Sequence, residues 1–329
     1  MSATVETPSK NEAGKQPPRV LRGMAWLVWR QHRTAFLACL ALAAAACLNM
    51  LWERASTMDY LAGGRAGMPD GDFRMAFQGT SYASAFQDGA WVMSMLPVVV
   101  GVFLGAPLIA GDLERGTLKL VTTQSMTRRR WLGTKTGMAV LVTLVCSVAL
   151  SAVFTWWWDG VHAVTFSDWT GGSDFDTTGP MPVAWSLLYL AVGIAFGVFV
   201  RRVLPAMMLT LGLFFAMGMV VWDKIRLLPF TPRVITNPVE QGQPPVPEGG
   251  ARFDNWTVDA HGGLHGFGAC SNERTPAACR ANKGIVAERL EYFGHDQMGA
   301  MQWTWAAILL AAALAVAGLT LWWVRRRPL

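Results

Sequence analysis

The stretch TGMAVLVTLVCSVALSAVFTWWW, residues 136–158, decides the fold. It contains no Asp, Glu, Lys, Arg or His, and it ends in three tryptophans. A helix of about 20 apolar residues is long enough to cross the hydrocarbon core of a bilayer. Tryptophan collects at the interface between membrane and water. The stretch therefore predicts a transmembrane helix.

Five further blocks share this composition, and none of the six contains a charged residue or histidine. The six predicted spans cover residues 34–52, 91–110, 136–158, 182–200, 203–222 and 303–324. The whole chain is 52% hydrophobic and 15% charged, whereas soluble domains are about 25% charged. The sequence therefore predicts an all-α integral membrane protein with six transmembrane helices. A cleaved signal peptide is the alternative for the first span, but the segment before it is too long and too helical for a leader.

The chain divides into five regions around these spans. Residues 1–18 are polar and predict a disordered cytoplasmic tail. Residues 19–33 place apolar side chains on one face and arginines on the other, which predicts an amphipathic elbow helix in the membrane interface. Residues 34–222 hold the first five spans. Residues 223–302 form a long extracellular loop that we expect to cap the outer helix ends, and residues 303–329 hold the sixth span and a basic cytoplasmic end.

The loops predict the orientation of the chain. Alternate segments, starting with the N terminus, carry 17 Lys and Arg and 4 Asp and Glu, a net charge of +13. The opposite segments carry 11 basic and 18 acidic residues, a net charge of −7. Because basic loops stay in the cytoplasm, we predict a multi-pass protein of the plasma membrane with both termini cytoplasmic. These flanks explain the formal net charge of +6, and no basic face interleaved with aromatics predicts binding to nucleic acid.

Two Gly-xxx-Gly pairs stand inside the predicted spans. They are Gly101 with Gly105 and Gly193 with Gly197. Small residues at this spacing let helices approach closely, either within one chain or between two copies.

The long extracellular loop carries the remaining candidate sites. Cys270 and Cys279 lie close together on the predicted oxidising side, which predicts a disulfide. His261 and His265 have the spacing of zinc ligands, but no glutamate stands beside them to activate water and the glycines between them disfavour a helix. We therefore expect no metal site. The loop is expected to lack a core of its own and to end in a helix-like stretch near residues 285–293.

The sequence also constrains the energy source. Ion-coupled carriers bind their coupling ion through ionisable groups at membrane depth, and the predicted spans have none. No GxxxxGK[ST] phosphate-binding loop occurs in the chain. We therefore expect no catalytic residue and no cofactor in this chain, and any ATPase that drives it must be a separate polypeptide.

Residues 111–130, between the second and third spans, carry the most informative motif. They begin GDLERGTLKL at Gly111 and end in three arginines before the third span. An acidic residue, a Gly-Thr pair, a leucine-rich turn and an arginine in this order resemble the cytoplasmic segment of ABC-2 type permeases. The matching positions are Glu114, Gly116, Thr117, Leu120 and Arg128. The elbow helix, which ends WRQHR, and the six-span topology resemble the same family. Without the resemblance, the arginines are ordinary anchors to lipid headgroups.

The resemblance implies a mechanism. Residues 111–130 would hold a coupling helix that rests on a separate ABC ATPase, which binds ATP and Mg²⁺, and the acidic pair Asp112 and Glu114 would meet a basic partner there. Two permease copies, or two related permeases, would form an exporter in the membrane lipid together with two ATPase subunits. Members of the family export drugs, peptides, lipids and glycans, and the sequence does not choose among them. The alternative is a non-transporting membrane sensor or assembly protein.

Overall fold

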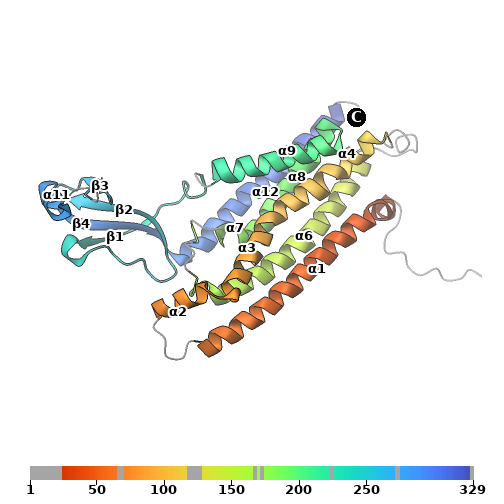
Figure 1. The fold of residues 1–329 in the computed structure, drawn as a ribbon. Helices are drawn as coiled ribbons and strands as arrows, with labels where there is room; N and C mark the ends of the chain where they lie inside the picture. The colour runs from red at the N-terminus through yellow and green to blue at the C-terminus, as the bar shows by residue number, and fades with distance from the viewer. Residues whose placement is uncertain are drawn as a thin grey trace, which may run out of the picture.

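The structure is a long helical bundle with a small β-sheet at one end (Figure 1). This computed structural model describes residues 24–64, 70–116, 128–165, 169–170, 174–222, 225–270 and 275–326. The start of α1 and the end of α12 both lie at the end of the bundle that is remote from the sheet (Figure 1). We call this end, which contains Glu114 and Arg326, the terminal end. The other, which contains Trp158 and His295, is the sheet end.

The described part of the chain contains α-helices, two π-helical turns (η1 and η2) and one short 3-10 helix (η3). They are α1 (Met24–Gly64), α2 (Asp70–Gln78), α3 (Ser81–Val99), η1 (Val100–Gly105), α4 (Ala106–Glu114), α6 (Arg128–Val161), α7 (Asp174–Thr177), α8 (Met181–Val200), α9 (Val203–Ala216), η2 (Met217–Trp222), η3 (Val239–Gln241), α11 (Pro276–Asn282) and α12 (His295–Arg326). The strands are β1 (Arg233–Pro238), β2 (Ala251–Asp259), β3 (Leu264–Gly266) and β4 (Ile285–Phe293).

Within the described residues, five helical segments are long and apolar enough to cross a membrane. They are Trp26–Gly64, Ser81–Glu114, Arg130–Val161, Met181–Val200 and His295–Arg326. The second of these is the continuous run of α3, η1 and α4. The apolar helix α9 is shorter, with 14 residues, and η2 continues it to Trp222. The chain is therefore a mostly helical integral membrane protein.

Helix α8 lies at the centre of the bundle, where it contacts α3, η1, α4, α6, α9 and α12. Its glycines meet those of the second span. A Cβ at Gly193 would lie 2.2 Å from the carbonyl oxygen of Gly101, and a Cβ at Gly197 would lie 2.6 Å from that of Ala106. A Cβ at Gly105 would lie 3.3 Å from the Cα of Gly193. The two Gly-xxx-Gly pairs therefore pack against each other within the chain.

The second span is irregular at this contact. Val100–Gly105 form a π-helical turn, three residues after the buried Pro97. Helix α4 then has a proline in its first turn. Proline removes one backbone donor and crowds the preceding turn, so a wider turn can form beside it.

The long loop contains a four-stranded antiparallel sheet, which the sequence analysis did not predict. The strand order is β1-β4-β2-β3. The stretch expected to be helix-like, Ile285–Phe293, is β4, one of the two inner strands. Its Glu, Arg and Leu residues favour a helix individually, but Leu290 is paired with Ile235 of β1 and Asn255 of β2. Pairing on both sides overrides this local propensity.

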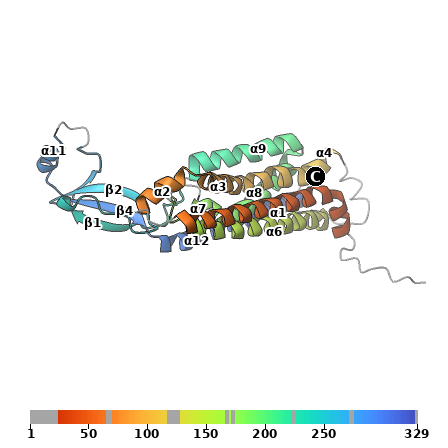
Figure 2. The same ribbon diagram turned by 60° about the horizontal axis from the view of Figure 1, so that its bottom comes forward.

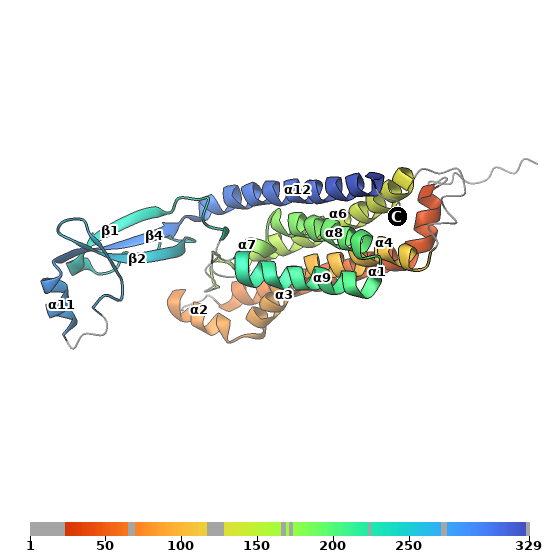
Figure 3. The same cartoon turned by 90° about the horizontal axis from the view of Figure 1, so that it is seen from above.

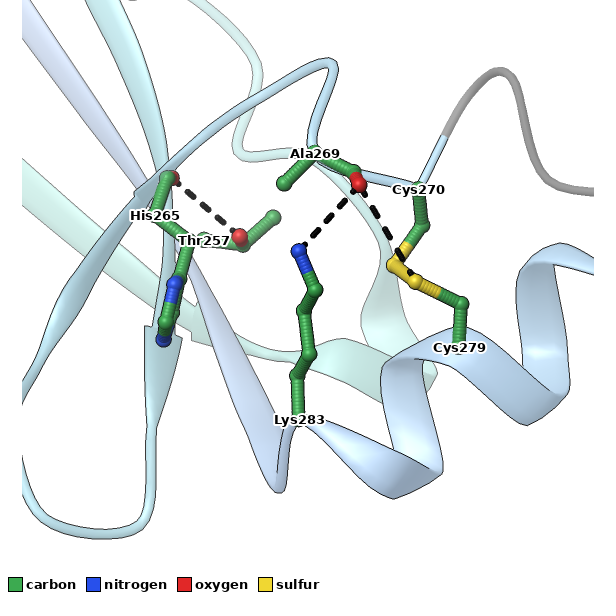
Figure 4. Close-up of a disulfide and its surroundings, with 6 residues drawn as sticks. All are labelled: Thr257, His265, Ala269, Cys270, Cys279 and Lys283. Carbon is green, nitrogen blue, oxygen red and sulfur yellow. Dashed lines mark hydrogen bonds between the residues drawn. A yellow bond between two sulfur atoms is a disulfide. The ribbon is translucent and has the colours of Figure 1, made fainter.

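The sheet extends beyond the helix ends instead of lying flat on them (Figures 1, 2 and 3). A disulfide between Cys270 and Cys279 ties the chain after β3 to α11, with the two Cα atoms 5.8 Å apart (Figure 4). The Nζ of Lys283 donates a hydrogen bond to the carbonyl oxygen of Ala269 at 3.4 Å, beside the disulfide. We call β1 to β4, together with η3 and α11, the sheet module. These contacts close the part of the sheet module that is farthest from the bundle.

A group of tryptophans around Asp176 of α7 anchors the base of the sheet module. The indole Nε1 of Trp222 donates to one carboxylate oxygen of Asp176 at 2.8 Å, and that of Trp185 donates to the other at 3.3 Å. Arg226 lies 3.7 Å from the same carboxylate. The Nε1 of Trp305 donates to the carbonyl oxygen of Arg226 at 2.7 Å. The chain that leads into the sheet is thus held by α7, α8 and α12.

The contact between the glycines of α8 and η1 predicts that one added methyl group lowers the stability of the protein. Gly193→Ala would place its Cβ against a backbone carbonyl, which cannot move without shifting η1. We expect destabilisation of about 1–3 kcal/mol, seen as a lower thermal unfolding midpoint of the purified protein in detergent. The control is Gly212→Ala in α9, where a Cβ would have no neighbour within 4 Å. Equal midpoints for the two variants would contradict this close packing of α8 against η1.

Candidate functional site

A buried ion pair at the terminal end joins three helices. Lys135 of α6 and Asp112 of α4 form a salt bridge, with Lys135 0% and Asp112 8% exposed. The amide Nε2 of Gln31 in α1 donates to the Oδ1 of Asp112 at 2.8 Å. The other carboxylate oxygen of Asp112, Oδ2, accepts a hydrogen bond from the Nζ of Lys135. One carboxylate thus connects α1, α4 and α6.

An aromatic ring lies beside this buried ion pair. The Nζ of Lys135 lies 5.0 Å from the ring centroid of Trp131, one turn earlier on α6. On α1, Trp29 stacks on Phe36 with the ring centroids 6.1 Å apart. A buried charge stays ionised only with close partners, so the ion pair constrains how the three helices meet. Sequence reasoning missed it because Asp112 and Lys135 lie just outside the predicted spans and resemble ordinary flanking charges.

Glu114 joins the end of α4 to the start of α9. This exposed residue accepts a hydrogen bond through its Oε2 from the backbone N–H of Val203 at 3.0 Å. Val203 is the first residue of α9, and the first N–H groups of a helix have no acceptor within the helix. A carboxylate also interacts favourably with the positive end of the helix dipole. Glu114 therefore acts as a cap for α9.

The link from α8 to α9 is short. It consists of Arg201 and Arg202, and Arg201 adopts a left-handed conformation with φ 60°. This turn separates the fourth and fifth predicted spans and places the start of α9 beside Glu114.

The other residues of the permease-like motif fall near the limit of the described chain. Gly116 follows α4 with φ +66°, and its N–H donates to the carbonyl oxygen of Leu113 at 3.3 Å. This left-handed conformation favours glycine and ends the helix. Thr117 and Leu120 lie outside the described residues. Arg128 begins α6, and its side chain is likewise outside them.

The structure distinguishes the two acidic residues that were expected to act as a pair, Asp112 and Glu114. Asp112 is buried and already contacts Lys135 and Gln31, whereas Glu114 is exposed. Of the two, Glu114 is the one whose carboxylate can meet another chain. The role of these residues in coupling stays a prediction.

The helices, the buried ion pair and the disulfide-closed sheet define a multi-span membrane protein with two different ends. The family model described as ABC-2 membrane transporter related matches residues 34–226, and the chain belongs to this family. No curated protein and no solved structure matches the chain. The matched region runs from the first predicted span through η2, so β1 to β4 and α12 lie beyond it.

The buried ion pair predicts an asymmetric response to substitution. Lys135→Met leaves the buried carboxylate of Asp112 without its cationic partner. We expect this to lower the free energy of unfolding by about 3–5 kcal/mol. The double variant Lys135→Met/Asp112→Leu removes both charges and should recover most of this loss. Thermal unfolding in detergent measures both variants. A double variant no more stable than Lys135→Met would contradict a stabilising role for this pairing.

Proposed function

We propose that this chain is the permease subunit of an ATP-driven exporter, and that a separate ABC subunit hydrolyses the ATP. Membership of the ABC-2 membrane transporter related family carries the proposal. The chain has no phosphate-binding loop, and the predicted spans hold no ionisable group that could bind a coupling ion. Work must then enter through a surface that contacts another protein.

In this proposal the chain crosses the membrane six times. α9 and η2 together run from Val203, beside Glu114, to Trp222 at the sheet end, where the ring of Trp222 lies 4.7 Å from that of Trp305. This segment therefore runs from the terminal end to the sheet end and serves as the fifth crossing. An even number of crossings agrees with the position of both described chain ends at the terminal end (Figure 1).

The first turns of α1 serve as the elbow helix. They lie across the direction of the remaining helix in the three views of the bundle (Figures 1, 2 and 3). In this orientation they would lie along the cytoplasmic membrane interface. Gln31 then links the elbow helix to Asp112, at the start of the coupling segment.

The segment around Asp112–Gly116 receives the work of the ATPase subunit. Asp112 contacts α1 and α6, and Glu114 contacts the start of α9. A displacement of this short segment therefore acts on three other helices at once. Two permease copies, or two related permeases, and two ATPase subunits form the exporter, with the transport path between the permeases.

The orientation can be tested with single cysteines in a variant that lacks Cys39, Cys47 and Cys146. Arg202 at the terminal end and Glu240 near the sheet are both exposed. We expect an impermeant thiol reagent to label Glu240→Cys in intact cells and to label Arg202→Cys only after permeabilisation. The opposite pattern would place the sheet in the cytoplasm and overturn the proposed topology.

The coupling role predicts a specific effect at Glu114. Glu114→Lys should reduce copurification of the ATPase at least about tenfold, because a reversed charge meets the basic partner proposed there. ATP-dependent export should be lost while membrane insertion stays near normal. Glu114→Gln keeps an oxygen for the Val203 N–H but removes the charge, so a comparable loss in this variant assigns the effect to charge. Normal export and an unchanged ATPase complex with Glu114→Lys would exclude coupling through this residue and favour a sensor or assembly protein.

A further inference from the structure

A cavity of about 700 Å³ lies where the sheet module meets the helical bundle. Residues from α2, α6, α7 and α12 form the bundle side of its wall, and the chain before β2 together with β2 itself forms the other. A volume of this size is typical of sites that enclose a small molecule or a headgroup. The cavity lies at the opposite end of the bundle from Glu114.

Parallel rings form part of the bundle side of this wall. The ring of His162 stacks on that of Trp158 with the centroids 4.7 Å apart, and His295 stacks on His162 at 5.2 Å with an interplanar angle of 1°. The indole Nε1 of Trp158 donates to the carboxylate of Asp174 at 3.2 Å. The ring positions are thus held by contacts within the protein, which lowers the cost of ordering them around a ligand.

The opposite wall is held close by a backbone contact. The Nε1 of Trp169 donates to the carbonyl oxygen of Gly249 at 3.2 Å. Gly249 has φ +66°, and a Cβ there would lie 3.2 Å from the Cβ of His295. Glycine at this position lets the chain before β2 approach the start of α12.

Two arginines and one glutamate line the same cavity. Arg74 comes from α2, Arg252 from β2, and Glu248 from the chain before β2. Within the described part of the chain, none of these three side chains has a hydrogen bond or an ion pair. The planar guanidinium suits a phosphate or a carboxylate, and a free carboxylate suits an ammonium group. This set of charges therefore favours a ligand that carries both signs.

The neighbouring part of α6 indicates the depth of the cavity in the membrane. Trp156 is 51% exposed, and the guanidinium of Arg54 lies 3.3 Å from its ring centroid. Exposed tryptophan and arginine at the end of an apolar helix mark the interface between membrane and water. Trp158, two residues further along, lines the cavity. The cavity thus begins at the level of the lipid headgroups.

We propose that this cavity binds a phospholipid headgroup that combines a phosphate with an ammonium group, as in phosphatidylethanolamine. Arg74 and Arg252 bind the phosphate, and Glu248 binds the ammonium. The stacked rings of Trp158 and His162 pack against the methylene groups that join the phosphate to the ammonium. The site does not involve the ATPase subunit and goes beyond the proposed export function.

The test is a titration of the purified full chain in detergent with two lipids that have the same acyl chains, followed by native mass spectrometry. We expect phosphatidylethanolamine to bind about tenfold or more tightly than phosphatidylglycerol, which has the phosphate but no ammonium. Arg74→Ala and Arg252→Ala should each weaken the binding of both lipids. Glu248→Gln should reduce the affinity for phosphatidylethanolamine to that for phosphatidylglycerol.

The controls are Arg202→Ala and Glu240→Gln, exposed positions of matched charge outside the cavity, which should leave both affinities unchanged. If Arg252→Ala does not fold, the lipid affinities of Arg252→Lys are measured instead, because this variant keeps the charge but lacks the planar guanidinium. Soluble glycerophosphoethanolamine, which has the headgroup without acyl chains, distinguishes a lipid from a free headgroup as the natural ligand. If it binds as tightly as phosphatidylethanolamine, the proposed headgroup chemistry is supported and the ligand can come from a soluble source. Equal affinities of the two lipids for the unmodified chain, or unchanged affinities in both arginine variants, would overturn the proposal.

Discussion

The backbones of η1 and α8 approach each other so closely that the glycines at the contact leave no room for a side chain. In a bilayer the hydrophobic effect does not drive helices together, so close packing between small residues contributes much of their association. α8 is therefore held at the centre, and α4, α9 and α12 take their places around it. By contrast, only 11% of the most apolar stretch of α1 is buried within the chain, which leaves this helix to face lipid or another subunit.

The two ends of the bundle use different chemistry to fix the helices between them. At the terminal end, the carboxylate of Asp112 gathers Lys135 and Gln31 in a buried site. At the sheet end, the carboxylate of Asp176 accepts hydrogen bonds from Trp185 and Trp222. Between these two sites the helices pack through apolar and small residues. Each carboxylate thus sets the position of several helices at the boundary where apolar packing ends.

Much of this fold is predictable from the sequence, because uncharged blocks of membrane length are a strong signal. Five of the predicted spans correspond to long apolar helices, and the paired cysteines form the disulfide. The sheet was missed because β4 is stabilised by β1 and β2, which are distant in sequence, while residues such as Glu288 and Leu290 favour a helix locally. The ion pair was missed for a similar reason: nothing near Lys135 in the sequence shows that Asp112 lies beside it. The link between Glu114 and Val203 also depends on the tertiary fold.

The π-helical turn at Val100–Gly105 has a consequence for how this span can change in evolution. A π turn takes up one more residue than an α turn, and an α-helix rotates by about 100° per residue. Restoring a regular α-helix here without deleting a residue would therefore rotate Asp112 by about that angle relative to Met93, and away from Lys135. Deleting one residue together with the π turn would instead keep Asp112 on the same face of the helix. A one-residue change in length and the presence of the wide turn are therefore linked, because changing either alone changes which face of α4 meets α6.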